Sequence, residues 1–363
     1  MQTEGTSNRI AYFDHLRVTS IFLIMVLHAA SLKWYDTDIH SASWLTMNAY
    51  KTLTDHAVLL FVMISGALFL SRDIPIKKIF SKYVLRMAVA FVVWSIIYAA
   101  VSNYMFGIGS VIEVALASHY HLWFIPMIAG LYICLPILRL FVRSDKMIRY
   151  FLLISFIIAF VIPAVLNLLS VFGNVTISGY LGGKTISDYA GYMYERLDES
   201  KICMVTGYAF YFIAGYYLHN IEFRKKARII LYCLAILNIA VTFAFSVLDA
   251  YTTGWPSDTF HANFNISVML AAAAIFVFFK NVIRDESNRT GYGKIIRILS
   301  DCSFGAYLIH ALVIEQLSLR LGLNALSFST VLAVPVIAVI TFAVSFAVSW
   351  LLNKIPFINK YIV

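Results

Sequence analysis

Residues 11–30, AYFDHLRVTSIFLIMVLHAA, form the first hydrophobic run of the chain and set its fold class. A helical run of about 20 apolar residues crosses a hydrocarbon layer of roughly 30 Å. This run nevertheless carries Asp14 and Arg17 near one end and His28 well inside. A charged or titratable group in hydrocarbon costs roughly 3 kcal/mol, so an intramembrane histidine indicates a functional residue.

The composition indicates that the rest of the chain is of the same kind. Of its 363 residues, 61% are hydrophobic and 13% are charged, whereas roughly a quarter of an average soluble domain is charged. We therefore predict an all-α polytopic membrane protein that forms a single integral-membrane domain, residues 1–363, with no separate soluble domain. About ten transmembrane helices are predicted, near residues 16–34, 55–71, 83–105, 121–142, 149–171, 201–219, 228–248, 262–280, 298–319 and 328–351.

Basic residues are distributed unevenly between the two predicted sides of the membrane. With the N-terminus in the cytoplasm, 22 of the 28 Lys and Arg residues fall on the inner side, together with 8 of the 19 acidic residues. This is the positive-inside pattern, so both termini are predicted to be cytoplasmic in a multi-pass protein of the cell membrane. The net charge of +9 then reflects topology and contact with membrane lipid, without a nucleic-acid partner.

The four cysteines indicate neither a disulfide framework nor a metal site. Cys134, Cys203, Cys233 and Cys302 all lie in apolar runs and form no C-x-x-C pair. Such residues are commonly small buried apolar side chains. No metal is therefore expected.

Histidines concentrate toward one side of the predicted membrane. His56, His121 and His261 fall near outer helix ends, while His28 and His310 fall about halfway along their helices. One interpretation is an outward-facing polar cavity in which a neutral imidazole acts as a base or a hydrogen-bond partner. The alternative is a set of interfacial histidines that meet headgroups and water, and it explains His28 and His310 least well.

Helical geometry predicts two polar seams that reach the same depth. Arg17 and His28 are eleven residues apart, which returns to nearly the same helix face about 16 Å higher. Ser303, Tyr307 and His310 follow i, i+4, i+7 spacing and share a face as well. This face should point into the bundle, because lipid would not satisfy three polar groups.

The inner segment SRDIPIKKIFSKYVLRM, residues 71–87, carries five cations within 15 residues. Arg72, Lys82 and Arg86 in it are candidates to neutralise the phosphates of a nucleotide-containing donor. The alternative is a positive anchor on anionic lipid, which the charge pattern alone favours.

Aromatic residues are frequent in the predicted outer segments, including Trp34, Trp44, Trp255 and the tyrosines of 180–194. They could stack on sugar rings, although Trp and Tyr are enriched at membrane interfaces in any case. The longest polar stretch, residues 172–200, is predicted to be an outer loop that partly covers an outer cavity.

Four stretches in order resemble the acyltransferase 3 family of membrane acyltransferases, in particular bacterial surface-polysaccharide O-acetyltransferases. They are DHLRVTSIFLIMVLH (14–28), FVMISGALFL (61–70) followed by KYVLR (82–86), HLWFIPMIAGLYICLP (121–136) and SFGAYLIH (303–310). The resemblance implies transfer of an acyl group, most often acetyl, from cytoplasmic acyl-CoA to a hydroxyl of a cell-surface or lipid-linked glycan on the extracytoplasmic side.

The resemblance also implies roles for individual residues. His28 matches the essential histidine of the family's first helix, and Asp14 with Arg17 matches its D-x-x-R motif. Lys82 and Arg86 fall where the family places arginines that meet CoA, although the first position is Lys here. His310 joins the catalytic candidates, Arg72 joins the acetyl-CoA-binding candidates, and the acceptor-binding candidates are His121, Trp123, Tyr307, Ser303, His56 and His261.

Two chemical versions of the transfer fit these residues. In one, His28 is a general base for direct attack by the acceptor hydroxyl. In the other, His28 is transiently acylated and relays the group outward. Asp14 is expected to orient Arg17, one turn away, in both versions.

Two other classes of function remain open at the sequence level. A transporter or flippase of a lipid-linked sugar would also have about ten helices and a polar midplane. A non-catalytic partner or sensor is the third reading. The identity of the acceptor glycan, the length of the acyl group and the oligomeric state are not determined by the sequence.

Overall fold

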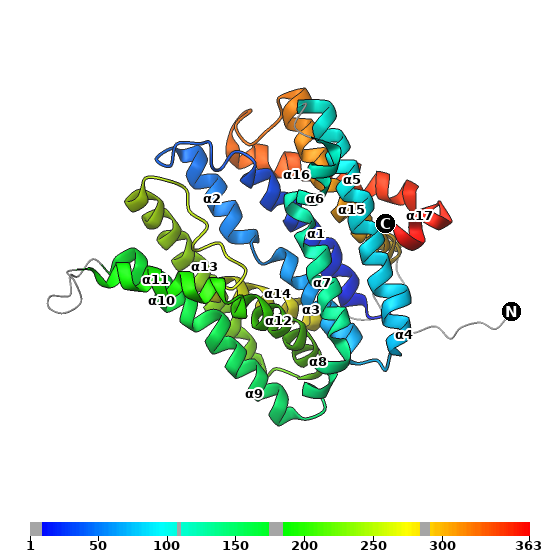
Figure 1. Cartoon of the computed structure of the whole chain (residues 1–363), viewed down its shortest axis with the longest axis horizontal. Coiled ribbons are helices and arrows are strands. Elements are labelled where there is room, and N and C mark those ends of the chain that lie inside the picture. Colours follow the sequence, from blue (N-terminus) through cyan, green and yellow to red (C-terminus); the bar gives the residue numbers. More distant parts are fainter. Residues whose placement is uncertain (1–8, 107–109, 174–183, 284–290) are drawn as a thin grey trace. The chain divides into compact units, whose positions relative to one another are not determined.

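The structure is a computed structural model of the chain, and it describes residues 9–106, 110–173, 184–283 and 291–363. The secondary-structure elements of these residues are helices, labelled in chain order in Figure 1. Part of the predicted outer loop (174–183) and part of one predicted inner basic segment (284–290) lie outside the described residues. The prediction of an all-α protein is confirmed.

The described residues include seven helices that are long and apolar enough to cross a membrane, or eight if one bent pair is counted as a span. This finding supports a multi-pass membrane protein. The count of ten and the cytoplasmic placement of both termini stay predictions. The seven spans are Ala11–Ser31, Ala42–Leu70, Ile76–Ser102, Asp145–Phe172, Lys225–Thr253, Gly291–Leu321 and Thr330–Asn353.

The second predicted helix, 55–71, is part of a longer span. Helix α2 (Ala42–Thr54) precedes α3 (Ala57–Leu70), and the two are interrupted at Asp55 and His56. Periodicity missed α2 because Asn, Lys and Thr are interspersed in it, whereas in the structure several of these polar residues are buried and hydrogen-bonded within the protein.

The predicted helix 121–142 begins just after one break and contains another. Val111–Ala117 and Tyr120–Ile133 form a pair bent by 45°, and Ser118 between them has a positive φ of 64°. A second break follows at Cys134, before α8 (Leu135–Phe141). Pro136 lies at the start of α8, where its missing N–H is tolerated because the first turn of a helix has no internal partner for it.

Two further predicted helices coincide with observed ones outside the seven spans. The range 201–219 corresponds to α12 (Ile202–Asn220), and 262–280 corresponds to the shorter α14 (Ile266–Val282). Within the predicted loop 172–200, the structure has a helix, α11 (Ile186–Glu199), which begins with a reciprocal Thr185–Asp188 capping box.

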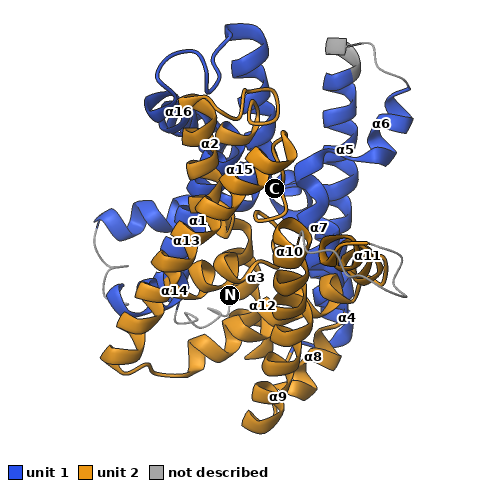
Figure 2. Cartoon of the chain, turned by 90° about the vertical axis from the view of Figure 1, so that its left-hand side faces the viewer, with its two compact units in different colours: residues 1–29, 74–133, 275–363 blue, residues 30–73, 134–274 orange. Residues whose placement is uncertain are grey.

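The chain divides into two compact units, coloured blue and orange in Figure 2. Unit 1 comprises Met1–Ala29, Ile74–Ile133 and Ile275–Val363. Its helices are α1 (Ala11–Ser31, up to Ala29), α4 (Ile76–Lys78), the π-helical η1 (Ile79–Val84), α5 (Leu85–Phe106), α6 (Val111–Ala117), the 3-10 turn η2 (Tyr120–Trp123), α7 (Phe124–Ile133), the end of α14, α15 (Gly291–Leu321), α16 (Thr330–Asn353) and α17 (Pro356–Tyr361).

Small residues bring α15 and α16 of unit 1 together. A Cβ atom on Gly305 would lie 2.3 Å from Ser349 Oγ, and this hydroxyl donates to the Cys302 carbonyl at 2.8 Å. Thr341 and Ser345 continue the same buried stripe of α16 at four-residue spacing. Small-residue stripes are a common means of helix packing in membranes, because they let two backbones approach closely.

Unit 2 comprises Ala30–Asp73 and Cys134–Ala274. The central pair is α3 and α12, which approach so closely that a Cβ on Gly66 would lie 1.7 Å from the Phe212 carbonyl oxygen and one on Gly215 would lie 2.0 Å from that of Met63. The helices of this unit are α2, α3, α8, α9 (Asp145–Phe156), the π-helical η3 (Ile157–Val161), α10 (Ile162–Phe172), α11, α12, α13 (Lys225–Thr253) and the first part of α14.

Candidate functional site

The two predicted polar seams face each other in unit 1. On α1, Asp14 accepts a hydrogen bond from Ser300 of α15 at 2.7 Å. Further along both helices, the ring of His28 lies 5.1 Å from that of His310, centroid to centroid. The residue numbers of the contacting pairs increase along both helices, so α1 and α15 run in the same direction. Their paired seams carry ionic groups at one level and imidazoles at another.

The ionic level is centred on Asp14, whose side chain is 1% exposed. Arg9 donates to it through Nε at 2.6 Å and Nη2 at 2.9 Å, and also pairs with Asp301 at 2.8 Å. Burial alone would lower the pKa of Arg9, but the hydrogen bonds to Asp14 and Asp301 raise it above its ordinary value. Asp14 is therefore the common acceptor for neighbouring guanidinium groups.

Arg17 is held more loosely at the same level. Its Nη1 lies 3.5 Å from Asp14 and 3.4 Å from the Ser300 hydroxyl, both long distances for a hydrogen bond. The expected pairing of Asp14 with Arg17 is present, but Asp14 contacts Arg9 more closely. Arg17 keeps a side chain 28% exposed, so its guanidinium has donors to offer a ligand.

The imidazole level contains three histidine rings from three segments of unit 1. His310 lies between His28, at 5.1 Å, and His121 of η2, also at 5.1 Å. Tyr120, which is 52% exposed, lies 5.3 Å from His28. His28 itself is half-buried, so the cluster is accessible at His28 and Tyr120.

One hydrogen bond orients the His310 imidazole, and another holds the backbone at His121. His310 Nδ1 donates to the Tyr307 carbonyl, and the Tyr307 hydroxyl donates to the His121 carbonyl. A neutral imidazole that donates from Nδ1 carries its lone pair on Nε2. His310 Nε2 and His121 Nε2 are buried and have no hydrogen-bond partner within the part of the chain that the structure describes. Unpaired buried polar atoms are costly and commonly mark functional sites.

Further polar groups contact His121 and one another. His119 Nδ1 lies 2.8 Å from His121 Nδ1, and His119 Nε2 lies 2.9 Å from Glu315 of α15. Tyr98 of α5 stacks on His119 with a centroid distance of 4.2 Å. Glu315, His119 and His121 therefore form a continuous hydrogen-bonded chain that ends one ring away from His310.

The predicted donor cations of unit 1 lie on η1 and α5. Lys82 is exposed on the π-helical turn. Arg86, one turn later, donates to the carbonyl of Val363 and lies over the Phe304 ring at 5.2 Å.

Trp123 is 37% exposed and Ser303 is buried on the face of Tyr307. Ser303 donates to the Ser300 carbonyl at 2.8 Å.

Three predicted site residues belong to unit 2. Arg72 is exposed just after α3. His261 is buried and bridges Asp55 Oδ2 at 2.6 Å and Asn48 Oδ1 at 3.0 Å. His56 is 2% exposed, and neither ring nitrogen has a partner in the described residues. The roles of these three residues in binding stay predictions.

In the described ranges, no group of three or more His, Cys, Asp or Glu side chains has an arrangement that could hold a metal ion. What the histidine cluster can do by itself is accept a proton at an imidazole nitrogen or attack an electrophile with it. The neighbouring cations can hold an anion. Together these capabilities suit group transfer from a charged donor.

Comparison with known protein families decides among the functional classes. The model of a family described as an acyltransferase domain matches residues 10–352, nearly the whole chain. The chain belongs to the acyltransferase 3 family. No curated protein and no solved structure matches it. The matched range includes every candidate site residue, so the acyltransferase assignment covers both units.

Several residues around the site of this acyltransferase were absent from the sequence-based candidates. Arg9, Ser300 and Asp301 surround Asp14, and Glu315 and Tyr98 support His119. Glu315 falls within the predicted span 298–319, and an acidic residue inside an apolar span is a signal of function. Tyr98 carried no comparable signal, because tyrosine is common in membrane helices.

Proposed function

We propose that the protein transfers an acyl group, acetyl in the simplest case, from cytoplasmic acyl-CoA to a hydroxyl of a cell-surface or lipid-linked glycan on the extracytoplasmic side of a bacterial cell membrane. The observation that carries this proposal is the pairing of α1 with α15. The pairing places Arg17 at one level and the His28–His310 pair at another. A charged donor held at the first level can present its reactive end to the second.

The donor side is formed by cations on the predicted inner surface. Arg17 lies 3.5 Å from Asp14 and 3.4 Å from Ser300, and Lys82 is exposed. Arg86 lies one turn from Lys82, and Arg72 is a further candidate from unit 2. Phosphates of acyl-CoA would bind these groups by charge-assisted hydrogen bonds, with bidentate geometry at arginine.

In the first chemical version, His28 acts as a general base. Its imidazole takes the proton of the acceptor hydroxyl while the hydroxyl oxygen attacks the thioester carbon. The carbon–sulfur bond breaks, and the CoA thiolate leaves and is protonated. General base catalysis of this kind contributes roughly 10²–10⁴ in rate. His310, with its lone pair on Nε2, lies one ring away and could accept the proton next.

In the second version, an imidazole nitrogen of His28 attacks the thioester and expels the CoA thiolate. The acyl-imidazole then transfers its acyl group to the acceptor hydroxyl, whose proton passes to the released imidazole. In this version the donor and the acceptor do not have to be bound at the same time. CoA also does not have to reach beyond His28. The partly exposed His28 ring is compatible with both versions.

The test uses purified protein in nanodiscs with carbon-14-labelled acetyl-CoA and a detergent quench at neutral pH, because acid would hydrolyse an acyl-imidazole. His28→Ala is expected to lower label transfer to membrane glycans by at least about 10²-fold. The matched control is His40→Ala, because His40 is an exposed histidine of unit 2 outside the imidazole cluster. Unchanged turnover in a folded His28→Ala protein would overturn the assignment, and absence of CoA release from the unaltered protein would favour a transporter.

The same assay without glycan distinguishes the two versions. Label retained on the unaltered protein, and absent from His28→Ala, identifies the acyl-imidazole route. CoA release that strictly requires glycan, with no labelled protein, identifies the general-base route. Mass spectrometry of surface glycans from cells with and without the protein then identifies the acceptor.

A further inference from the structure

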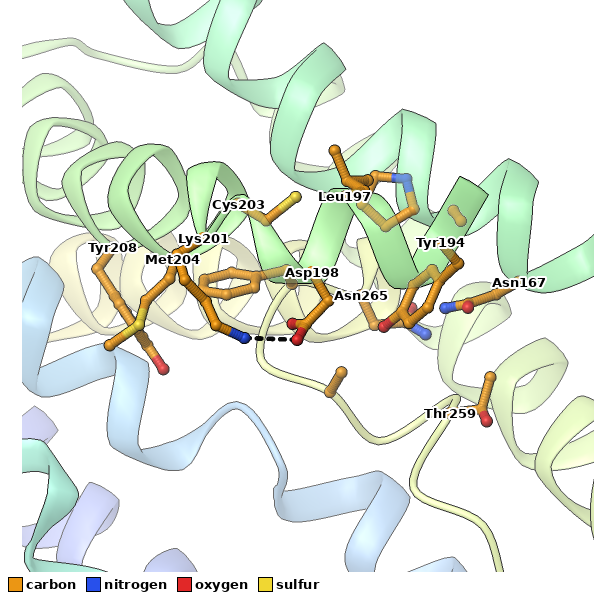
Figure 3. Close-up of a pocket in the computed structure, with 14 residues that line it drawn as sticks. Asn167, Tyr194, Leu197, Asp198, Lys201, Cys203, Met204, Tyr208, Thr259 and Asn265 are labelled. Atoms are coloured by element: carbon orange, nitrogen blue, oxygen red, sulfur yellow. Dashed lines mark hydrogen bonds and ion pairs between the residues drawn. The ribbon is translucent and has the colours of Figure 1, made fainter. Parts of the chain in front are cut away.

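Unit 2 contains a pocket that none of the steps above uses (Figure 3). Its volume is about 250 Å³, and α10, α11, the start of α12 and the segment before α14 contribute its lining. This volume is close to the lower limit of small-molecule sites, roughly 300 Å³. The pocket therefore suits one ring-sized ligand rather than an extended chain.

One wall of the pocket is aromatic and held in place by packing. Tyr208 and Phe264 meet edge to face with centroids 4.9 Å apart. Gly207 makes this contact possible, because a Cβ there would lie 2.3 Å from the Phe264 ring. Asn263 donates to the Tyr208 hydroxyl at 3.0 Å, which fixes the phenol ring. A fixed aromatic wall provides flat apolar area at a low entropy cost.

The opposite wall is polar and neutral. Tyr194 of α11 lies beside Asn167 of α10 in the lining (Figure 3). Thr259 adds a hydroxyl from the segment before α14, and the Asn265 amide beside it is held in place by the Phe260 carbonyl at 3.1 Å and the Ser267 N–H at 2.9 Å. Amide and hydroxyl groups both donate and accept hydrogen bonds. Such groups match a ligand that carries several hydroxyls around its ring.

The charged groups of the lining cancel each other. Lys201 Nζ lies 2.5 Å from Asp198 Oδ2, and the two form the ion pair drawn in Figure 3. A carboxylate or phosphate ligand would have to compete with Asp198 for Lys201, whereas an uncharged ligand leaves the pair intact. The lining therefore has no net charge that would attract an anionic ligand.

The pocket lies near one end of its helices. Asn167 is five residues before the end of α10, and Tyr208 is six residues after the start of α12. The chain between these two helix ends is the predicted extracytoplasmic segment 172–200, which contains α11. A soluble glycan on that side would meet the pocket without crossing the membrane.

We propose that this pocket binds a single uncharged pyranose ring of the acceptor glycan. The aromatic wall covers an apolar face of the sugar, and the amide and hydroxyl groups bind its rim. The proposal rests on the proposed function, because that function makes a glycan the acceptor. It adds a subsite in unit 2 and restricts the ring bound there to neutral sugars.

The test measures sugar binding directly, by saturation-transfer NMR on the full-length protein in nanodiscs. The probes are the methyl glycosides of glucose, mannose and N-acetylglucosamine, with methyl glucuronide as the anionic comparison. At least one neutral glycoside is expected to bind, and the glucuronide is expected to bind at least about tenfold more weakly. Tyr194→Ala is expected to weaken neutral-sugar binding by about tenfold or more.

Tyr192→Ala is the matched control, since Tyr192 lies on the same helix, is 50% exposed and is not part of the pocket lining. It should bind the glycosides as the unaltered protein does. Asn167→Leu provides a second loss-of-binding variant, so misfolding of one variant does not decide the outcome. Absence of binding by all neutral glycosides, or equal binding by Tyr194→Ala and Tyr192→Ala, would overturn the proposal.

His28→Ala separates this proposal from the proposed function. Sugar binding by a His28→Ala protein should be unchanged, even if the variant shows that His28 has no role in acyl transfer. Conversely, Tyr194→Ala could transfer acyl groups with an unchanged KM for the acceptor. This result would overturn the proposed sugar site but not the proposed acyltransferase chemistry. Displacement of a spin-labelled lipid tail, without any sugar signal, would identify a lipid site and also overturn the proposal.

Discussion

The imidazole of His28 on α1 lies 5.1 Å from that of His310 on α15, and the His310 ring lies the same distance from His121. The three residues are separated by 93 and 189 positions along the chain, so the cluster is a product of helix packing within unit 1. Its central member, His310, is fully buried, with Nδ1 engaged by the Tyr307 carbonyl and Nε2 unpaired. We therefore expect His310 to position His28 or to exchange a proton with it.

Replacing His310 should impair the chemical step more than substrate binding. We expect His310→Ala to lower kcat by about 10²-fold, because a small misplacement of a catalytic group has an effect of that size, while KM for acetyl-CoA changes little. His310→Asn should recover part of the activity, since its amide can still donate to the Tyr307 carbonyl. Steady-state kinetics in nanodiscs provide the measurement, and an unchanged kcat in His310→Ala would remove His310 from the site.

The ionic group at Asp14 should contribute to both stability and donor binding. Asp14→Ala removes the shared acceptor of Arg9, Arg17 and Ser300. We expect a loss of about 1–3 kcal/mol in the free energy of unfolding and a raised KM for acetyl-CoA. Asp301→Asn is the control, because Asp301 also contacts Arg9 but is 60% exposed. This substitution should lower the free energy of unfolding by no more than about 1 kcal/mol. Equal effects of the two substitutions would contradict the central place of Asp14.

The close approach of α3 and α12 makes a prediction for unit 2. A methyl group at Gly66 or Gly215 would overlap a backbone carbonyl oxygen, which has no freedom to move aside. Gly66→Ala and Gly215→Ala should each destabilise the protein by about 1–3 kcal/mol or more, as overpacking does. Gly191→Ala on α11 is the matched control, since a Cβ there meets nothing within 4 Å. Thermal unfolding in detergent should show lower midpoints for the first two variants and no decrease for the third.

A polar network in unit 2 should give a pH-dependent contribution to stability. Burial alone would raise the pKa of Asp258, but Lys51 at 3.1 Å and the Tyr35 hydroxyl lower it below its ordinary value of 3.8. A carboxylate whose pKa is lower in the folded state stabilises the fold at pH values above its ordinary pKa. This contribution is lost as the pH falls through the pKa of the folded state.

The measurement compares the unaltered protein with Asp258→Asn over a series of pH values. The unaltered protein should have the higher unfolding midpoint at pH 7, by a small amount because Asp258 is 52% exposed. The difference should shrink as the pH falls below 3.8. A difference that is constant down to the lowest pH would show that the Lys51–Asp258 pair does not contribute through ionisation.

The limits of the sequence-based prediction can be seen in α2 and α16. Long apolar runs, such as α16 with its mean hydropathy of 2.7, are read reliably because lipid requires a continuous apolar surface. The sequence did not predict α2, because Asn48, Lys51 and Thr52 are buried in unit 2 instead of facing water or lipid. A hydropathy pattern cannot show that a polar side chain will find a partner such as Ser246, 198 residues away in the chain.

The candidate site shows the same division. The motifs around Asp14, Arg17, His28 and His310 identified the family, and helix periodicity predicted that Arg17 and His28 share a face. Neither could place Glu315, His119 and Tyr98 around His121, because those contacts depend on how α5, η2 and α15 pack.

The sequence by itself determined that the protein is all-α and membrane-spanning, and its motifs predicted the family that the comparison then established. Both properties are local: apolar length sets the span, and short motifs carry the family pattern. The tertiary structure alone decided that the α1 and α15 seams face each other, that three imidazoles from separate segments form one cluster, and that unit 2 contains a neutral aromatic pocket. These features depend on contacts between residues far apart in the chain, where side-chain volume and hydrogen-bond geometry select one packing.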